Sequence, residues 1–469
     1  MFTRFLFPGL LFLFISPAFA GDTLSTPRLV GPIKFSGNKI TKEYILRREL
    51  TFHTGDTITQ DALTKKIVRS RENLLNTSLF NFVTIRDSLH SDSLTVSVHI
   101  EVKERWYTWP VPIFEIVEQN VNTWWNNGHN LERANYGMLV TRYNFRGRKE
   151  SVGIALRLGY SERLGVSYNM PFLNKKQTIG AGFSVSYTRN HEVAYRTQNN
   201  ILQFYKNHSK YLREEFYSRF YLSYRPNLYI THISDIRFTN TLVNDTIREL
   251  NPDYYPNRET RMEYFAASYR FACDHRDLKA YPKAGWFFDA EVAQLGFGLL
   301  PKEGLSVTNF YGSFRRYYKI GKKFSWAGSL RGKLSPSRNQ PYYVQRAFGF
   351  GLYVRGYEYY MIDGQSFALA KTQFRYEIIK PQVRKIKFLP IEKFNTLHIA
   401  LYGSIFADAG YTDDRFSDPI LNNRLSNDYL FGTGAGLDFV TYYDIVLRAE
   451  YSFNKLGESG FFLHLGAPL

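Results

Sequence analysis

Apolar residues occupy every second position along much of the chain after residue 105, which is the pattern of β-strands with two different faces. In residues 152–160, Val, Ile, Leu, Leu and Tyr alternate with Gly, Ala, Arg and Gly. Residues 179–187 and 445–453 repeat the pattern, in the last case over Arg448, Glu450 and Ser452. The alternation predicts a long series of antiparallel strands with one apolar face and one polar or charged face.

Residues 29–104 have a different pattern, which predicts a small mixed α/β domain. Apolar positions at helical spacing occur twice, and strictly alternating ones follow at 94–102. Gly37-Asn38 and Gly55-Asp56 mark turns, and Thr41 is expected to cap the first helix. The predicted elements are a strand at Leu29–Phe35, helices at Lys42–Leu50 and Thr59–Leu75, and strands at Phe80–Arg86 and Leu94–Val102.

The first 20 residues are typical of a secretory signal peptide. Arg4 precedes the apolar stretch Phe5–Ile15, and Ala18-Phe19-Ala20 is a small-x-small cleavage signal. Cleavage is expected after Ala20, and because Gly21 rather than Cys follows, a lipoprotein anchor is not expected.

Composition indicates whether the rest of the chain could span a membrane with helices or with strands. Hydrophobic residues make up 44% and aromatic residues 17%, yet mean hydropathy is −0.33. After residue 20 no window offers the roughly 18 uncharged apolar residues of a spanning helix, so a spanning region must be a closed barrel. At roughly 20 to 25 residues for each strand and its connection, residues 105–469 allow about 16 strands. The expected fold is a transmembrane antiparallel β-barrel preceded by one small α/β domain.

The net charge of +18 raises the possibility of nucleic-acid binding, but the basic residues are spread along a secreted chain. A positive barrel lumen, or anionic lipid at the rims, explains the charge better. Cys273 is the single cysteine, so no internal disulfide forms. Because G-x-S-x-G, H-E-x-x-H and Cys-based metal spacings are lacking, we expect no enzyme activity, metal or cofactor.

The segment 29–104 resembles a POTRA domain, the periplasmic module of outer-membrane assembly proteins. The resemblance lies in the order and spacing of short matches. They are Phe35-Ser36-Gly37-Asn38, Thr41, Gly55-Asp56, Leu79-Phe80 and Val102-Lys103-Glu104.

Residues 105–469 resemble the Bam-, Sam- and Tam-type assembly superfamily, also called the bacterial surface antigen family. The most specific match is Val354-Arg355-Gly356-Tyr357 after Phe348-Gly349-Phe350-Gly351, and Phe406-Ala407-Asp408-Ala409-Gly410 resembles the family's F-x-D-x-G strand. The resemblance implies that Arg355 lies in an extracellular loop folded into the lumen and forms a salt bridge with Asp408.

Three further matches occur in the family's order. They are Asn135-Tyr136-Gly137 to Tyr168–Phe172 for the opening hairpins, Asp274–Asp277 with Tyr281–Gly285 for a tight periplasmic turn, and Gly434–Leu437 with Tyr443–Tyr451 for the penultimate hairpin. The C-terminus resembles the family's strand signal at Phe461, Leu463 and Leu465, but Leu469 stands where an aromatic residue is usual and Pro468 precedes it.

The resemblance implies an outer-membrane protein that inserts or folds client barrels, with its POTRA domain in the periplasm. Implied partners are unfolded client proteins, outer-membrane lipids, and periplasmic chaperones or assembly lipoproteins. A polypeptide-translocating pore and an accessory barrel without insertase activity remain alternatives. For the insertase, the weakest seam is expected between an opening strand at Tyr136–Asn144 and the strand at Phe461–Leu465.

Overall fold

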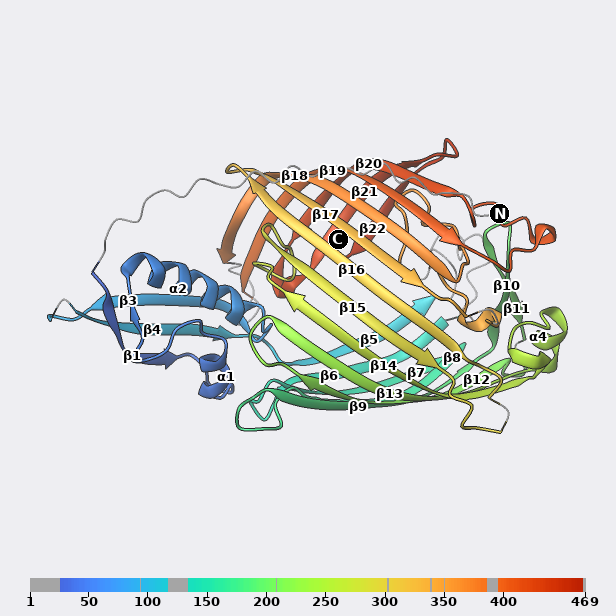
Figure 1. The fold of residues 1–469 in the computed structure, drawn as a ribbon, viewed down its shortest axis with the longest axis horizontal. Helices are drawn as coiled ribbons and strands as arrows, with labels where there is room; N and C mark the ends of the chain where they lie inside the picture. Colours follow the sequence, from blue (N-terminus) through green and yellow to red (C-terminus); the bar gives the residue numbers. More distant parts are fainter. Residues whose placement is uncertain are drawn as a thin grey trace.

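The computed structural model describes residues 26–92, 94–116, 134–207, 209–301, 303–337, 340–349, 351–385 and 395–466, and the expected signal peptide lies outside these ranges. A small α/β domain lies at one end of a large antiparallel barrel (Figure 1). No helix in the described ranges is both long enough and apolar enough to span a bilayer.

The N-terminal domain is a four-stranded sheet, ordered β2-β1-β4-β3, packed against two helices. Apolar residues from the sheet and both helices form one core, because alternating strand positions and one helix face all point inward. Its elements are β1 (Arg28–Ser36), α1 (Glu43–Arg48), β2 (Thr57–Ile58), α2 (Gln60–Leu75), β3 (Phe80–Leu89) and β4 (Thr95–Glu104).

The expectation that Thr41 caps the first helix is wrong. Lys42 is the residue at the start of α1, and its side chain makes no capping bond. The Thr41 N–H and hydroxyl both donate to the buried Glu104 carboxylate, each at 2.6 Å. The charged Glu104 carboxylate at the end of β4 is a strong acceptor, so the Thr41 hydroxyl donates to it instead of accepting from the N–H groups of the helix.

The barrel is a sheet of 16 strands in which each strand pairs with its antiparallel neighbour, so the strand number agrees with that expected from the sequence. Large apolar side chains such as Ile154, Ile236 and Leu330 are exposed on its outer face. The strands are β5 (Thr108–Ile116), β6 (Ala134–Phe145), β7 (Glu150–Gly159), β8 (Ser161–Met170), β9 (Ile179–Asn190), β12 (Arg213–Tyr224), β13 (Ile230–Val243), β14 (Arg261–Asp274), β15 (Gly285–Leu295), β16 (Val307–Ile320), β17 (Phe324–Leu334), β18 (Ser366–Lys385), β19 (Thr396–Asp413), β20 (Tyr429–Val440), β21 (Val446–Asn454) and β22 (Ser459–Leu465).

The end of the barrel opposite the α/β domain carries the longer connections (Figure 1). A separate hairpin, β10 (Glu192–Gln198) with β11 (Ile201–Lys206), and the short helix α4 (Asp245–Leu250) lie there. The 3-10 turns are Pro256–Arg258, Tyr342–Val344, Pro419–Leu421 and Tyr442–Asp444.

The first barrel strand is β5, whereas the sequence pattern placed the opening strand at Tyr136–Asn144, which is the second strand, β6. The pattern missed β5 because Pro110 and Pro112 argue against an interior strand. An edge strand tolerates proline, and β5 and β22 end the strand order with no ladder joining them in the described residues.

The connection between β14 and β15 is also not the tight turn that the sequence suggested. It spans residues 275–284, and its Tyr281 hydroxyl donates to Asp438 on β20 at 2.6 Å. The Arg375 guanidinium on β18 donates to the Pro282 carbonyl at 2.9 Å. The connection therefore crosses from its own strands to the wall formed by β18 and β20.

The α/β domain is docked on the connections at its end of the barrel. The Lys42 N–H donates to the Gly147 carbonyl at 2.9 Å, and the Asn76 side chain donates to the Asp277 carbonyl at 2.8 Å. Arg225, between β12 and β13, donates to both oxygens of Glu49 at 2.8 and 3.1 Å. Burial opposes ionisation of Glu49, but the hydrogen bond and charge of Arg225, together with the charges of Lys149 and Arg48, outweigh it and lower the pKa of Glu49 to about 2.

Because the folded pKa of Glu49 lies below its ordinary value of 4.5, its pair with Arg225 stabilises docking fully above that value. This stabilisation is lost as the pH falls from about 4.5 toward 2. We expect Glu49→Gln to lower amide protection, corrected for intrinsic exchange, in α1 at neutral pH and to remove its acid dependence. Glu43→Gln, an exposed change on the same helix, is the control; equal protection in the two variants would contradict the assignment.

Candidate functional site

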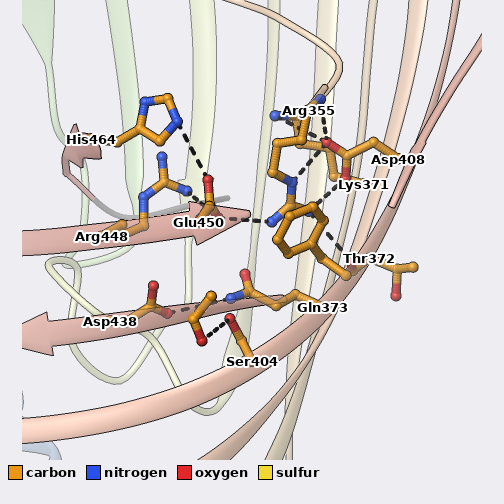
Figure 2. Close-up of polar contacts among 12 residues, drawn as sticks. Arg355, Lys371, Thr372, Gln373, Ser404, Asp408, Asp438, Arg448, Glu450 and His464 are labelled. Atoms are coloured by element: carbon orange, nitrogen blue, oxygen red, sulfur yellow. Dashed lines mark hydrogen bonds and ion pairs between the residues drawn. The ribbon is translucent and has the colours of Figure 1, made fainter. Parts of the chain in front are cut away.

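The loop between β17 and β18, residues 335–365, begins at the barrel end opposite the α/β domain and folds against the inner wall. Val354 and Tyr357 are buried among side chains of the loop itself and of β18 and β20. Arg355 points into a cluster of charged side chains from β18, β19 and β21 (Figure 2). All four residues of the motif 354–357 therefore lie at the contact between loop and wall.

Arg355 and Asp408 form a fully buried two-pronged ion pair. The Arg355 Nη2 lies 2.5 Å from Asp408 Oδ1, and its Nε lies 2.9 Å from Asp408 Oδ2. The Arg355 backbone N–H donates to the same Oδ2 at 3.1 Å. Since both side chains have 0% exposure, the pair holds the backbone and the side chain of the loop tip at one point of β19.

Further charges balance this pair. Glu450 on β21 accepts from Arg355 Nη1 at 3.3 Å and from Arg448 at 3.4 Å, and Lys371 on β18 lies 3.4 Å from Asp408. The Arg355 guanidinium carbon lies 3.8 Å from the centre of the Phe406 ring. Buried charges persist only when they are paired and hydrogen-bonded, and here each carboxylate has more than one cation.

Two glycines permit the loop to approach the wall. A Cβ atom on Gly432 of β20 would lie 1.7 Å from the Arg355 carbonyl oxygen, so only glycine fits there. Gly356 has φ of +94°, which other residues adopt at a cost, and its carbonyl accepts from the Asn454 side chain at 2.9 Å. Gly432 of β20 and Gly356 of the loop therefore both serve the packing of the loop against the wall.

The same loop touches the inner face of the terminal strand β22. The Tyr353 ring stacks on His464 with centroids 5.2 Å apart, and its hydroxyl lies 3.0 Å from His464 Nδ1. His464 Nε2 lies 3.4 Å from Glu450, so the charged cluster reaches β22 (Figure 2). Tyr359 lies beside Phe462, with ring centroids 5.1 Å apart.

The structure brings together Arg355 and Asp408, which the sequence motifs had paired. Sequence reasoning missed Glu450 and Lys371 in this cluster and His464 beside it. The sequence pattern could have indicated Glu450, because it is a charged residue at an inward-facing position of a strand whose outward-facing positions are apolar. Phe461, Leu463 and Leu465 lie on the exposed outer face of β22, and Leu469 lies outside the described residues.

The free edge of β5 offers few backbone donors. The Tyr143 N–H donates to the Tyr107 carbonyl at 2.7 Å, in register with the pairing of Thr108 and Arg142. Hydrogen-bonded residues alternate along an antiparallel pair, so odd-numbered residues of β5 bond to β6 and even-numbered ones face the free edge. Pro110 and Pro112 both face that edge and have no N–H to donate.

The free edge of β22 keeps its donors. The Gly466 N–H donates to the Val446 carbonyl at 2.8 Å, so even-numbered residues of β22 bond to β21. Phe461, Leu463 and Leu465 therefore direct their N–H groups toward the seam. Where β22 faces the two prolines, each pair of opposed residues can make at most one backbone hydrogen bond instead of two.

Solved structures with a similar fold cover nearly the whole chain. The BamA of Haemophilus ducreyi lacking POTRA domains 1–3 aligns over 94% of this chain and 84% of its own, at 16% identity and a TM-score of 0.51. CdiB from Escherichia coli aligns over 93% of this chain and 75% of its own, at 10% identity and a TM-score of 0.53. No curated protein sequence matches the chain.

Family models match both parts of the chain. The surface antigen variable number repeat, or POTRA, matches residues 29–105, and the Omp85 superfamily domain matches residues 144–441. The α/β domain is thus a POTRA domain, which places it in the periplasm and the barrel in the outer membrane. The chain belongs to the Omp85 superfamily.

Proposed function

We propose that this protein inserts client β-barrels into the outer membrane by opening between β5 and β22. Family membership already supports a role in outer-membrane protein assembly or translocation. The observation that favours insertion is the seam, because Pro110 and Pro112 weaken it at the β5 edge while β22 keeps unpaired donors. A client strand that pairs with β22 would satisfy these donors without exposing its own backbone to lipid.

The POTRA domain supplies a second strand edge in this proposal. β3 is the outer strand of the POTRA sheet, and no strand pairs with its other edge in the described residues. An unfolded client could add a strand there by backbone hydrogen bonds, which are indifferent to most of the client sequence. No covalent bond is made or broken in either step.

The Arg355 cluster, meaning Arg355, Asp408, Glu450, Lys371 and Arg448, is proposed to lock the loop to the wall formed by β18–β21. The loop in turn supports β22 from inside through Tyr353 and His464. With the loop held, β22 can separate from β5 while it keeps its ladder with β21.

A translocating pore and an accessory barrel are the rival functions, and depletion in the native host separates all three. The insertase proposal expects many outer-membrane barrels to disappear together when the protein is depleted. Loss of one secreted polypeptide with other barrels intact would favour the pore. Intact barrels and intact secretion would favour the accessory role.

The lock predicts that Arg355→Ala destabilises the folded barrel by about 3 to 5 kcal/mol, because it leaves Asp408 and Glu450 in a buried site with less positive charge. Asp408→Ala should have a comparable effect. The double variant Arg355→Asp with Asp408→Arg should recover only part, since residue 408 would then place a cation beside Lys371. Heat-modifiability on gels and client insertion are the measurements.

Arg346→Ala is the matched control, since it removes an exposed arginine from the same loop. It should leave the melting behaviour close to that of the wild type. If Arg355→Ala and Asp408→Ala behaved like Arg346→Ala in both assays, the lock would be wrong.

Closing the seam covalently should abolish client insertion. Phe114 on β5 and Leu463 on β22 both have exposed side chains on the outer face, so cysteines there can be scanned for crosslinking in a Cys273→Ser background. The control is a cysteine pair at Ala449 and Leu463, register partners in the β21–β22 ladder. Full insertion with the seam crosslinked would exclude lateral opening.

A further inference from the structure

A second charged cluster lies between the POTRA domain and the barrel, and its charges do not balance. Five cationic side chains line a cavity of about 40 Å³ there: Arg69, Lys149, Arg225, Arg276 and Lys279. The acidic residues that line the same cavity are Glu49 and Asp274. The lining therefore carries three more positive than negative charges.

The carboxylates of this cavity are already committed to partners. Glu49 accepts two hydrogen bonds from the Arg225 guanidinium, and Asp274 accepts two from the Arg276 guanidinium, at 2.9 and 2.8 Å. Lys279 reaches Asp274 only at 3.5 Å, and Arg69 is held by Glu72 at 3.0 Å. These pairs fix the positions of the cations around the cavity without neutralising all of them.

Lys149 is the cation of the cavity that has no carboxylate partner among the described residues. Its ammonium group has no hydrogen bond or ion pair among the residues that the structure describes. Lys149 lies in the connection between β6 and β7, outside the strands. Burial and the neighbouring charges of Arg225, Lys279 and Arg48 lower the pKa of Lys149 to about 8, against the attraction of Glu49.

The lining comes from separate segments that meet only in the docked arrangement. Arg69 belongs to α2 of the POTRA domain, whereas Lys149, Arg225 and Lys279 belong to three different connections of the barrel. A group bound in the cavity would therefore contact both domains. It would stabilise the docked position of the POTRA domain.

We propose that this cavity binds a phosphoryl group at the junction of POTRA domain and barrel. A carboxylate carries one negative charge, whereas a phosphate approaches two near neutral pH and better matches the excess of positive charge. Arginine and lysine are both common phosphate ligands. The site is distinct from the Arg355 cluster and does not depend on the insertase proposal.

The size of the space limits the ligand. A cavity needs about 10 to 15 Å³ to hold one water, so about 40 Å³ accommodates a single small oxyanion in place of a few waters. A second cavity of about 160 Å³ shares Arg225, Leu228, Asp274 and Lys279 with the first. The substituent of a larger phosphoryl compound, such as a lipid, would extend into this second cavity.

The test measures the thermal unfolding of the full-length protein in a neutral detergent with a phosphate-free buffer. Ligands that bind only the folded state raise the transition temperature with concentration. Inorganic phosphate should therefore raise it, and chloride at matched ionic strength should not. Phosphatidylglycerol added to the micelles, compared with diacylglycerol, identifies a lipid headgroup as the source if it acts where inorganic phosphate does not.

The variants Lys149→Gln and Lys279→Gln should each reduce the phosphate-dependent shift by more than half, and together abolish it. Lys322→Gln is the matched control, because it removes an exposed lysine from the connection between β16 and β17 at the same end of the barrel. Heat-modifiability should show that all variants are folded. No shift with either phosphate or phosphatidylglycerol, or an equal shift in the double variant and the wild type, would overturn the proposal.

Discussion

The pairing of backbone groups in lipid is the constraint on which the rest of this structure depends. A strand in the bilayer must direct every N–H and C=O to a neighbour, and the neighbouring strands from β5 to β22 do so along the sheet. The ends of the sheet are the exception. Pro110 and Pro112 remove donors from one side of the seam, so the sequence itself limits how well the barrel can close.

Charge pairing is the second constraint, and it is met differently at two places. In the Arg355 cluster each buried carboxylate has more than one cationic neighbour, and the loop is fixed against β19. At the POTRA junction the cations outnumber the carboxylates, and the Lys149 ammonium group has no hydrogen bond or ion pair among the described residues. In the first cluster the carboxylates are paired with cations of the chain itself, whereas the excess of cations in the second is suited to an anionic ligand.

Much of the architecture follows from sequence periodicity. Strict alternation over residues 152–160 predicts a two-faced strand, and chain length predicts about 16 strands, because both depend on local geometry alone. The contact of Arg355 with Asp408 could be expected only from family motifs, since 53 residues separate the two. Periodicity contains no information on which distant residues meet.

The errors of sequence reasoning have physical causes. β5 was missed because prolines indicate a loop unless the strand is known to be an edge. The connection 275–284 was expected to be a tight turn because Pro and Gly favour one, but Tyr281 gains a buried hydrogen bond with Asp438 across the barrel. Thr41 was expected at a helix cap because nothing local indicates that Glu104 lies beside it.

Residue-resolved amide hydrogen exchange of the full-length protein in a lipid bilayer tests the weak seam most directly. Within β22, the N–H groups of Phe461, Leu463 and Leu465 face the seam, while those of Phe462 and His464 bond to β21. The weak seam predicts fast exchange at the first three and strong protection at the other two. Equal protection of both sets, at the level of interior strands such as β16, would show a closed seam and contradict it.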